Sequence, residues 1–377
     1  MIVLNFSNML LILFLTAFNL FLGFSLIFPI FPSFVKELNG SPSDVGLLVS
    51  IQPLMQFLFS PIWGKLSDKY GRKKFIFLGM LGYAISFYFT AIANSIEFLY
   101  FARIFGGIIS SSAIPTILAY ASSISSNNKR NVSLGIIGAG FGLGLVIGPF
   151  IGGLVGHFDI RTVFFVSFYI FLLNALLVQL FLKEVKVQTL HSKKLKFNLL
   201  NSYVLFASIV YLVILLCATA MQIILGMLLT YKFHLDTLNI GMILGIGGVF
   251  GVISQFSIGP LLKKFSEKSL IVFSVLLLGI TIFIVGFVNN VEFLYLLTAL
   301  YGISFGISQP NLTARVSKKI PDEYQGEFMG IFQAFGSIGR FLGPILCSLL
   351  YQFHPSLPYL ISGIILIIFS LLCLLWI

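Results

Sequence analysis

Two arginines lie inside apolar stretches of this 377-residue chain, where a charged side chain is costly and therefore informative. At 1.5 Å of helix per residue, Arg103 lies ~10 Å and Arg340 ~20 Å from one end of its stretch. We expect one or both to line a central cavity and to favour an anionic or zwitterionic substrate. The alternative is that each guanidinium packs against backbone carbonyls at a helix interface.

Uncharged polar residues in the apolar stretches add further candidates. Asn19, Gln222, Gln309 and Gln333 all qualify, and Gln333 shares a helix face with Arg340. We expect these four residues and the two arginines to serve substrate binding or coupling. The twelve acids all lie in predicted loops or within about two turns of the end of an apolar stretch, which argues against a carboxylate at mid-span as the proton carrier.

The sequence shows no catalytic or metal-binding pattern. It has no HExxH motif, no nucleophile motif and no buried pair of a histidine and an acid, and all four histidines fall in predicted loops. The three cysteines lie inside apolar stretches without the spacing of metal ligands. We therefore expect no enzymatic activity, no metal site and no cofactor.

The elements that must position the polar residues are membrane-spanning helices. The chain is 58% hydrophobic and 9% charged, with a mean hydropathy of +1.05. Breaks at charged, proline-rich and Asn/Ser-rich stretches leave twelve apolar segments long enough to cross a bilayer core of ~30 Å. They cover residues 8–31, 43–64, 75–94, 96–119, 132–155, 162–182, 201–230, 239–262, 269–288, 291–313, 328–350 and 358–377.

The placement of positive charge predicts the orientation. With a cytoplasmic N-terminus, only Lys36, Arg161 and Lys232 among the 23 basic residues fall in outside loops. Arg103 and Arg340 lie within spans, which leaves 18 on the inside. By the positive-inside rule both termini are cytoplasmic in a multi-pass protein of the cell membrane. The same distribution explains the net charge of +11 without nucleic acid as a partner.

An internal repeat divides the spans six and six. A shift of 195 residues superposes Gly46 on Gly241, and Gly148-Pro149 on Gly343-Pro344. A parallel repeat of six spans is an architecture of secondary transporters, with the binding site near the membrane midplane. The predicted domains are a first six-helix bundle at 1–182, a cytoplasmic loop at 183–200 and a second bundle at 201–377. An old duplication in a protein that transports nothing is the alternative.

The stretch GKLSDKYGRKKF at 64–75 joins the second and third predicted spans. Its basic residues fit a cytoplasmic loop that fixes topology, but that reading does not explain its glycines or its acid. The loop resembles the signature loop of the major facilitator superfamily, with Gly64, Asp68, Gly71, Arg72 and Lys73 at the matching positions. The resemblance implies a conformational latch, in which Asp68 meets the N-terminus of the eleventh span.

Three further motifs resemble the twelve-span drug–proton antiporters of that superfamily. The fifth span carries the antiporter-type helix motif GxxxGPxxGG, although a general helix-packing stripe is the alternative. LGFSLIFPIFP at 22–32 matches the Leu-Gly and Pro-x-x-Pro pattern of the first span. Arg103 and Gly107 match a motif of the fourth span in which the arginine is linked to proton transfer. The residues of the fifth-span motif are Gly144, Gly148, Pro149, Gly152 and Gly153.

The resemblance implies the major facilitator fold, an all-α architecture of two six-helix bundles. We expect a monomeric secondary transporter in the lipid bilayer that exports small amphipathic, drug-like molecules by alternating access in exchange for protons. The alternative function is a facilitator, or an anion-linked carrier, of a specific anionic or zwitterionic metabolite. The buried arginines and the missing mid-span carboxylate favour that alternative.

Overall fold

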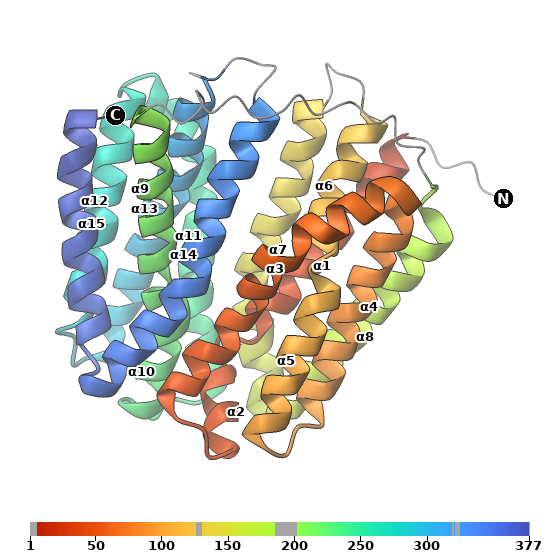
Figure 1. Cartoon of the computed structure of the whole chain (residues 1–377). Coiled ribbons are helices and arrows are strands. Elements are labelled where there is room, and N and C mark those ends of the chain that lie inside the picture. The colour runs from red at the N-terminus through yellow and green to blue at the C-terminus, as the bar shows by residue number, and fades with distance from the viewer. Residues whose placement is uncertain (1–5, 126–129, 185–201, 319, 321–324, 377) are drawn as a thin grey trace. The chain divides into compact units, whose positions relative to one another are not determined.

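The computed structural model describes residues 6–125, 130–184, 202–318, 320 and 325–376, and in these ranges it contains helices and no strand (Figure 1). Twelve helical stretches are long and apolar enough to span a membrane, which confirms the predicted number. The elements are α1 (Phe6–Leu26), α2 (Phe31–Glu37), α3 (Pro42–Tyr70), α4 (Arg72–Ala91), α5 (Ile96–Ser110), α6 (Ala113–Ile124), α7 (Arg130–Phe158), α8 (Ile160–Phe181), α9 (Ser202–Thr219), a π-helical segment (Ala220–Ile224), α10 (Leu225–Tyr231), α11 (Thr237–Leu262), α12 (Glu267–Val285), α13 (Val291–Ser317), α14 (Gln325–Phe353) and α15 (Leu357–Trp376).

The chain forms two compact units. Unit 1 comprises Met1–Gly40 and Leu54–Ser192, and unit 2 comprises Ser41–Pro53 and Lys193–Ile377. The start of α3 therefore groups with unit 2, whereas the predicted domains place all residues up to 182 in the first bundle. Most of the predicted loop at 183–200 lies outside the described residues, so the division into domains stays a prediction.

Side-chain caps begin several helices at the ends of the spans. The side chains of Ser95, Asp159, Asp236 and Ser266 accept backbone N–H groups at the starts of α5, α8, α11 and α12. The hydroxyl and backbone N–H of Thr162 hold the pKa of Asp159 below its ordinary value. Because lipid offers no hydrogen bonds, a spanning helix satisfies its backbone internally and needs such partners only at its ends.

The first span is shorter than predicted. The sequence predicts one span over 8–31, but α1 ends at Leu26 and a separate short helix, α2, begins at Phe31. Pro29 accounts for the break, because a proline removes a backbone donor and disfavours helical geometry in the residue before it. Pro32 lies in the first turn of α2, where a proline is tolerated. The break buries Phe31 and Phe34 of α2 within unit 1.

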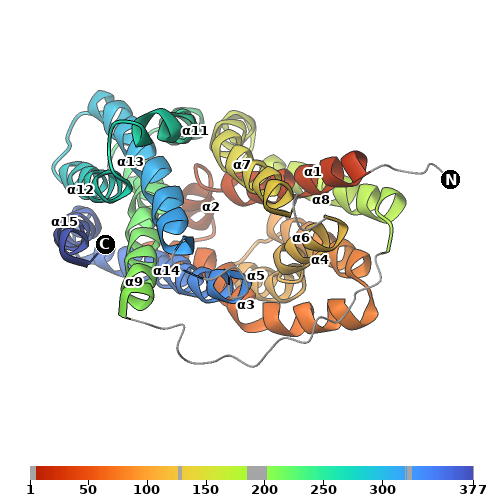
Figure 2. The ribbon, with the colours of Figure 1, turned by 90° about the horizontal axis from the view of Figure 1, so that it is seen from above.

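The glycine motif of α7 packs against α1, its neighbour in Figure 2. A Cβ built on Gly144 would lie 2.6 Å from the backbone nitrogen of Leu22, and one on Gly148 would lie 2.9 Å from the Leu22 carbonyl oxygen and would overlap Ser25. The hydroxyl of Ser25 in turn donates to the Gly144 carbonyl at 3.0 Å. Gly152 meets the backbone of Leu26 in the same way. The two backbones are therefore in direct contact along this stripe.

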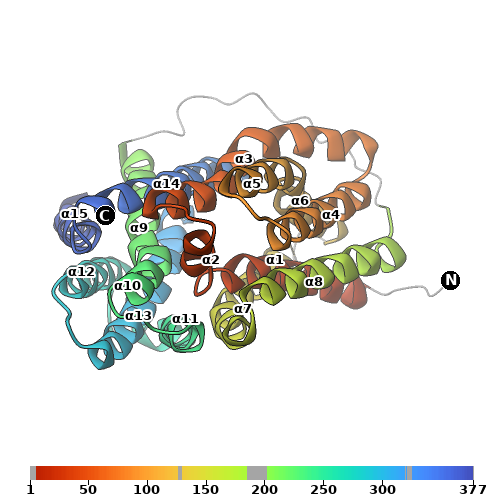
Figure 3. The ribbon, with the colours of Figure 1, turned by 90° about the horizontal axis from the view of Figure 1, so that it is seen from below.

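Unit 2 repeats this contact between α14 and α9, which also lie side by side in Figure 3. A Cβ on Gly339 would lie 2.5 Å from the Leu212 carbonyl oxygen and 3.2 Å from the backbone nitrogen of Leu216. One on Gly343 would lie 2.7 Å from the Leu216 carbonyl oxygen and 2.6 Å from the hydroxyl of Thr219. Glycines at equivalent positions of the 195-residue repeat thus perform equivalent packing.

We predict that Gly148→Ala destabilises the protein, whereas Gly142→Ala on the same helix does not. A Cβ at Gly148 collides with Ser25, while one at Gly142 meets nothing within 4 Å. Overpacking of this kind costs about 1–3 kcal/mol, so the thermal unfolding midpoint of the purified Gly148→Ala variant should fall. Equal midpoints for the two variants would contradict the proposed backbone contact.

Candidate functional site

Arg103 is buried inside unit 1 between two phenylalanine rings. Its side chain is 4% exposed, and the central carbon of its guanidinium lies 4.7 Å from the ring centroid of Phe31 and 5.8 Å from that of Phe87. The aromatic faces stabilise the cation from the sides but cannot accept its in-plane hydrogen bonds. The two rings therefore stabilise the charge of Arg103 without accepting hydrogen bonds from its guanidinium N–H groups.

Two of the Arg103 nitrogens, Nε and Nη2, are buried and have no hydrogen-bond partner. These two atoms lie on the same edge of the guanidinium and donate in parallel, which is the geometry that a carboxylate accepts. The alternative prediction, packing against backbone carbonyls, would have provided acceptors for them. This unpaired edge has the geometry to receive an anionic group, and the role of Arg103 in substrate binding stays a prediction.

Arg340 lies in a more polar setting on α14. It is half-buried, and its Nη2 donates to the hydroxyl of Ser337 at 3.2 Å, while that hydroxyl donates to the Gln333 carbonyl at 3.0 Å. The side chain of Gln333 is exposed. The predicted face of Gln333, Ser337 and Arg340 is therefore continuous, although its role in substrate binding stays a prediction.

The remaining predicted polar residues have different surroundings. Asn19 on α1 and Gln309 on α13 are half-buried. Gln222 lies in the π-helical segment, and its Nε2 donates to the hydroxyl of Tyr301 on α13 at 3.2 Å. Neither the π-helical segment nor Tyr301 was predicted from the sequence. A break in α-helical periodicity has no residue signature, and the partner of Gln222 lies 79 positions away.

The predicted latch residues form a charged network within unit 1. Arg72 pairs with Asp68 at 2.8 Å, and its Nη1 also donates to the Ala119 carbonyl and the Ser123 hydroxyl of α6. The Asp68 side chain remains 48% exposed. A Cβ on Gly64 would meet nothing within 4 Å. The latch to the eleventh span stays a prediction, since these contacts are all made inside one unit.

Glu184, just beyond the end of α8, is a residue that the sequence did not point to. Its carboxylate accepts the backbone N–H of Lys73 at 3.2 Å and thereby caps the N-terminus of α4, where the helix dipole favours an anion. Gly71 adopts φ +106, and a Cβ there would lie 2.5 Å from the Glu184 carboxylate. The hydroxyl of Tyr120 holds the preceding Lys183 carbonyl at 2.7 Å. The backbone angle therefore favours glycine at position 71, and a side chain there would also displace the Glu184 carboxylate from its place at the start of α4.

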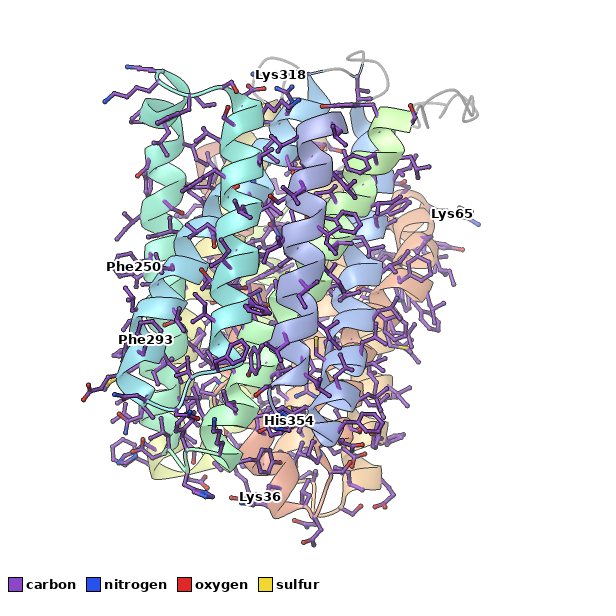
Figure 4. All side chains as sticks on the ribbon, turned by 90° about the vertical axis from the view of Figure 1, so that its left-hand side faces the viewer. Lys36, Lys65, Phe250, Phe293, Lys318 and His354 are labelled. Carbon is purple, nitrogen blue, oxygen red and sulfur yellow. The ribbon has the colours of Figure 1, made fainter. Side chains whose placement is uncertain are left out.

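Acids in the described helices all lie near helix ends, as predicted. In unit 2, Glu267 at the start of α12 pairs with Lys318 and lies 3.8 Å from Arg315. Figure 4 shows Lys318 at one end of the helices of this unit and His354 toward the other. Among the described residues, no three His, Cys, Asp or Glu side chains could hold a metal ion together.

Comparison with known proteins identifies a matching family and relatives that align over nearly their whole length. A family model described as the Major Facilitator Superfamily matches residues 13–253 and, in a second overlapping match, 207–377. Multidrug resistance protein 2 of Bacillus subtilis is 29% identical, over 97% of this chain and 94% of its own. The quinolone resistance protein NorA of Staphylococcus aureus is 27% identical, over 94% and 92%.

Solved structures with the same fold are more distant in sequence. The nucleoside transporter NupG has a TM-score of 0.78 at 14% identity and covers 97% of this chain and 98% of its own. A bacterial homologue of the lysosomal transporter Spinster has a TM-score of 0.82 at 13% identity and covers 98% and 97%. These similarities establish the predicted transporter fold over nearly the whole chain.

We predict that Arg103→Met keeps or raises the thermal unfolding midpoint but lowers transport at least about tenfold. Replacing an unpaired buried charge by an apolar side chain of similar length relieves desolvation, whereas a charge-assisted bond to a substrate is lost. Arg161→Met is the matched control. Arg161 also stacks on a phenylalanine of α2, Phe34 at 5.5 Å, but donates to the Ala91 carbonyl at 2.8 Å. A lower midpoint with unchanged transport would make Arg103 a packing residue.

We predict that Asp68→Asn impairs transport much more than folding. Arg72 retains the Ala119 carbonyl and the Ser123 hydroxyl as acceptors, and an exposed ion pair contributes only about 0–1 kcal/mol to stability. Membrane abundance and the unfolding midpoint should therefore remain close to those of the unmodified protein. Normal transport by this variant would refute the latch.

Proposed function

The chain belongs to the major facilitator superfamily, and from this we propose that it is a secondary active exporter of small amphipathic, drug-like molecules. The export works by alternating access, with protons exchanged for the substrate. The observation that carries the proposal is the similarity to a multidrug resistance protein over 97% of the chain. A transporter of this kind carries out no enzymatic reaction.

The aromatic content of the polar sites suits amphipathic substrates. Gln222 contacts Tyr301, whose ring stacks on Phe305 with centroids 5.5 Å apart, so an amide adjoins a continuous aromatic surface. Flat apolar molecules bind aromatic faces, and a few polar groups then fix their orientation. This arrangement supports binding of molecules that are largely apolar but carry polar substituents.

In the described part of the chain, no acid lies at mid-span to carry a proton. An ionisable carboxylate inside a span is the usual carrier in proton-coupled transporters. Every acid in the described spans lies near a helix end, as Asp68 and Glu97 illustrate. Proton coupling therefore has to be measured independently of substrate movement.

The second candidate function rests on Arg103. Its unpaired Nε and Nη2 atoms match an anionic group, so a facilitator or an anion-linked carrier of an anionic or zwitterionic metabolite is the alternative. This function does not require protons, and it predicts that carboxylate-bearing compounds are transported in preference to cations.

We further propose that the protein is a monomer of the cell membrane with both termini in the cytoplasm. The bias of basic residues toward one set of loops supports this orientation. The twelve apolar helices make it a multi-pass membrane protein.

We predict that inside-out vesicles containing the protein accumulate lipophilic drug-like compounds when a pH gradient is imposed. Addition of a transported compound should partly dissipate the gradient, measured by a pH-sensitive dye, and a protonophore should abolish accumulation. Vesicles without the protein are the control. Movement of anionic compounds without a change in pH would favour the second candidate function, and movement of no compound would overturn the proposal.

A further inference from the structure

The π-helical segment Ala220–Ile224 interrupts a long apolar helix within unit 2. It follows α9 directly and leads directly into α10, so the three elements form one span, Ser202–Tyr231. A π-helical turn is rare and is frequently found at functional sites. Gln222 lies at the centre of this segment and is the one residue in it with a hydrogen-bonding side chain.

The hydrogen bonds around Gln222 determine which way its amide points. Its Nε2 donates to the Tyr301 hydroxyl at 3.2 Å, and that hydroxyl has a long contact of 3.5 Å to the Ala218 carbonyl. A tyrosine hydroxyl has a single proton, and the carbonyl can only accept it. The hydroxyl must then accept from the amide, so Gln222 presents its NH₂ group to Tyr301 and not its oxygen.

Tyr301 is itself held in place. It is 8% exposed, and its ring stacks on Phe305 at an interplanar angle of 15°. The next residue, Gly302, packs directly on the Gly247 backbone of α11, where a Cβ could not fit. The hydroxyl is thus a rigid acceptor, and in the described part of the chain no donor reaches the Oε1 atom of the half-buried Gln222.

We propose that Tyr301 is a positioning residue that fixes Gln222 with its amide oxygen free for substrate, so that this site selects molecules carrying an N–H or O–H donor. The inference deepens the proposed function and rests on it. A freely rotating glutamine would accommodate donors and acceptors alike. A fixed amide oxygen cannot donate to an acceptor on the substrate. A molecule without a donor therefore makes no polar contact here, and in an apolar environment its affinity is lower than that of a molecule with a donor.

Two lipophilic cations of equal charge separate donor selection from charge selection. Ethidium carries two aromatic NH₂ groups, whereas tetraphenylphosphonium has no N–H or O–H donor. With vesicles containing the full chain, Tyr301→Phe should raise the apparent KM for ethidium about fivefold, which is the typical effect of one hydrogen bond. The KM for tetraphenylphosphonium should remain unchanged, because its binding does not use the amide oxygen.

Gln222→Met tests the same bond from its other partner. This variant should raise the KM for ethidium as Tyr301→Phe does, and the double variant should show no further loss, because the two residues act through one hydrogen bond. If Tyr301→Phe fails to reach the membrane, Gln222→Met still tests the amide oxygen itself: a loss confined to ethidium supports selection of donors at this site, and an equal loss for both cations overturns it.

Tyr83→Phe is the matched control in unit 1. Tyr83 is also buried, stacks on Phe171 and accepts a hydrogen bond from a glutamine, Gln56, at 3.3 Å, but its partner lies in a regular α-helix. The ratio of the two KM values should stay constant in this variant. A changed ratio in Tyr83→Phe, additive effects in the double variant, or equal effects of Tyr301→Phe on both cations would each overturn the role of Tyr301.

Failure of the proposed function gives a different result. An unmodified protein that exports neither cation would refute drug export, whatever the variants do. The comparison would then be made on binding of ethidium and tetraphenylphosphonium to the purified full chain, where the same ratio of affinities decides whether Tyr301 positions the amide.

Discussion

Direct contact between a glycine on one helix and the backbone of its neighbour is the interaction on which both units depend. Apolar side chains gain nothing by leaving lipid for one another, so spanning helices associate through close packing and through the polar contacts that close packing allows. Gly148 against Leu22 and Gly343 against Leu216 supply that contact in the two units. The polar residues of each unit are positioned by helices whose spacing these glycines set.

The polar groups of the protein fall into two classes once the helices are packed. Asp68, Arg72 and Glu184 meet their partners within unit 1, and their charges are compensated locally. Arg103 is the opposite case, a cation enclosed by aromatic rings with its hydrogen-bonding edge unpaired. Local compensation is compatible with a structural role, whereas an uncompensated buried donor is rare in folded proteins, which is why we propose an anionic group as the partner of Arg103.

Much of this architecture could be predicted from the sequence because lipid imposes simple rules on it. The length of the apolar segments predicted twelve helices, loop charge predicted their orientation, and the glycine stripe of Gly144 and Gly148 was expected to permit backbone contact. The contacts of Glu184 and Tyr301 could not be predicted. Their partners lie 111 and 79 positions away, and no periodic pattern connects residues at such separations. The early end of α1 at Leu26 was missed because hydropathy does not register the geometric effect of Pro29.

The π-helical segment has a counterpart in the first half of the chain. The residues that meet equivalent glycines, Phe18 and Leu212, Leu22 and Leu216, and Ser25 and Thr219, are each 194 positions apart, whereas the later spans repeat at 195. The second half therefore contains one extra residue, and it falls in the connection 232–236, because α10 (Leu225–Tyr231) lies 194 positions after α2 (Phe31–Glu37) whereas α11 begins 195 positions after α3. At the same offset of 194, the π-helical segment Ala220–Ile224 corresponds to residues 26–30, where α1 ends before α2 begins. Both first spans of the repeat thus depart from a regular α-helix at the same place, by a break in unit 1 and by a π-helical segment in unit 2.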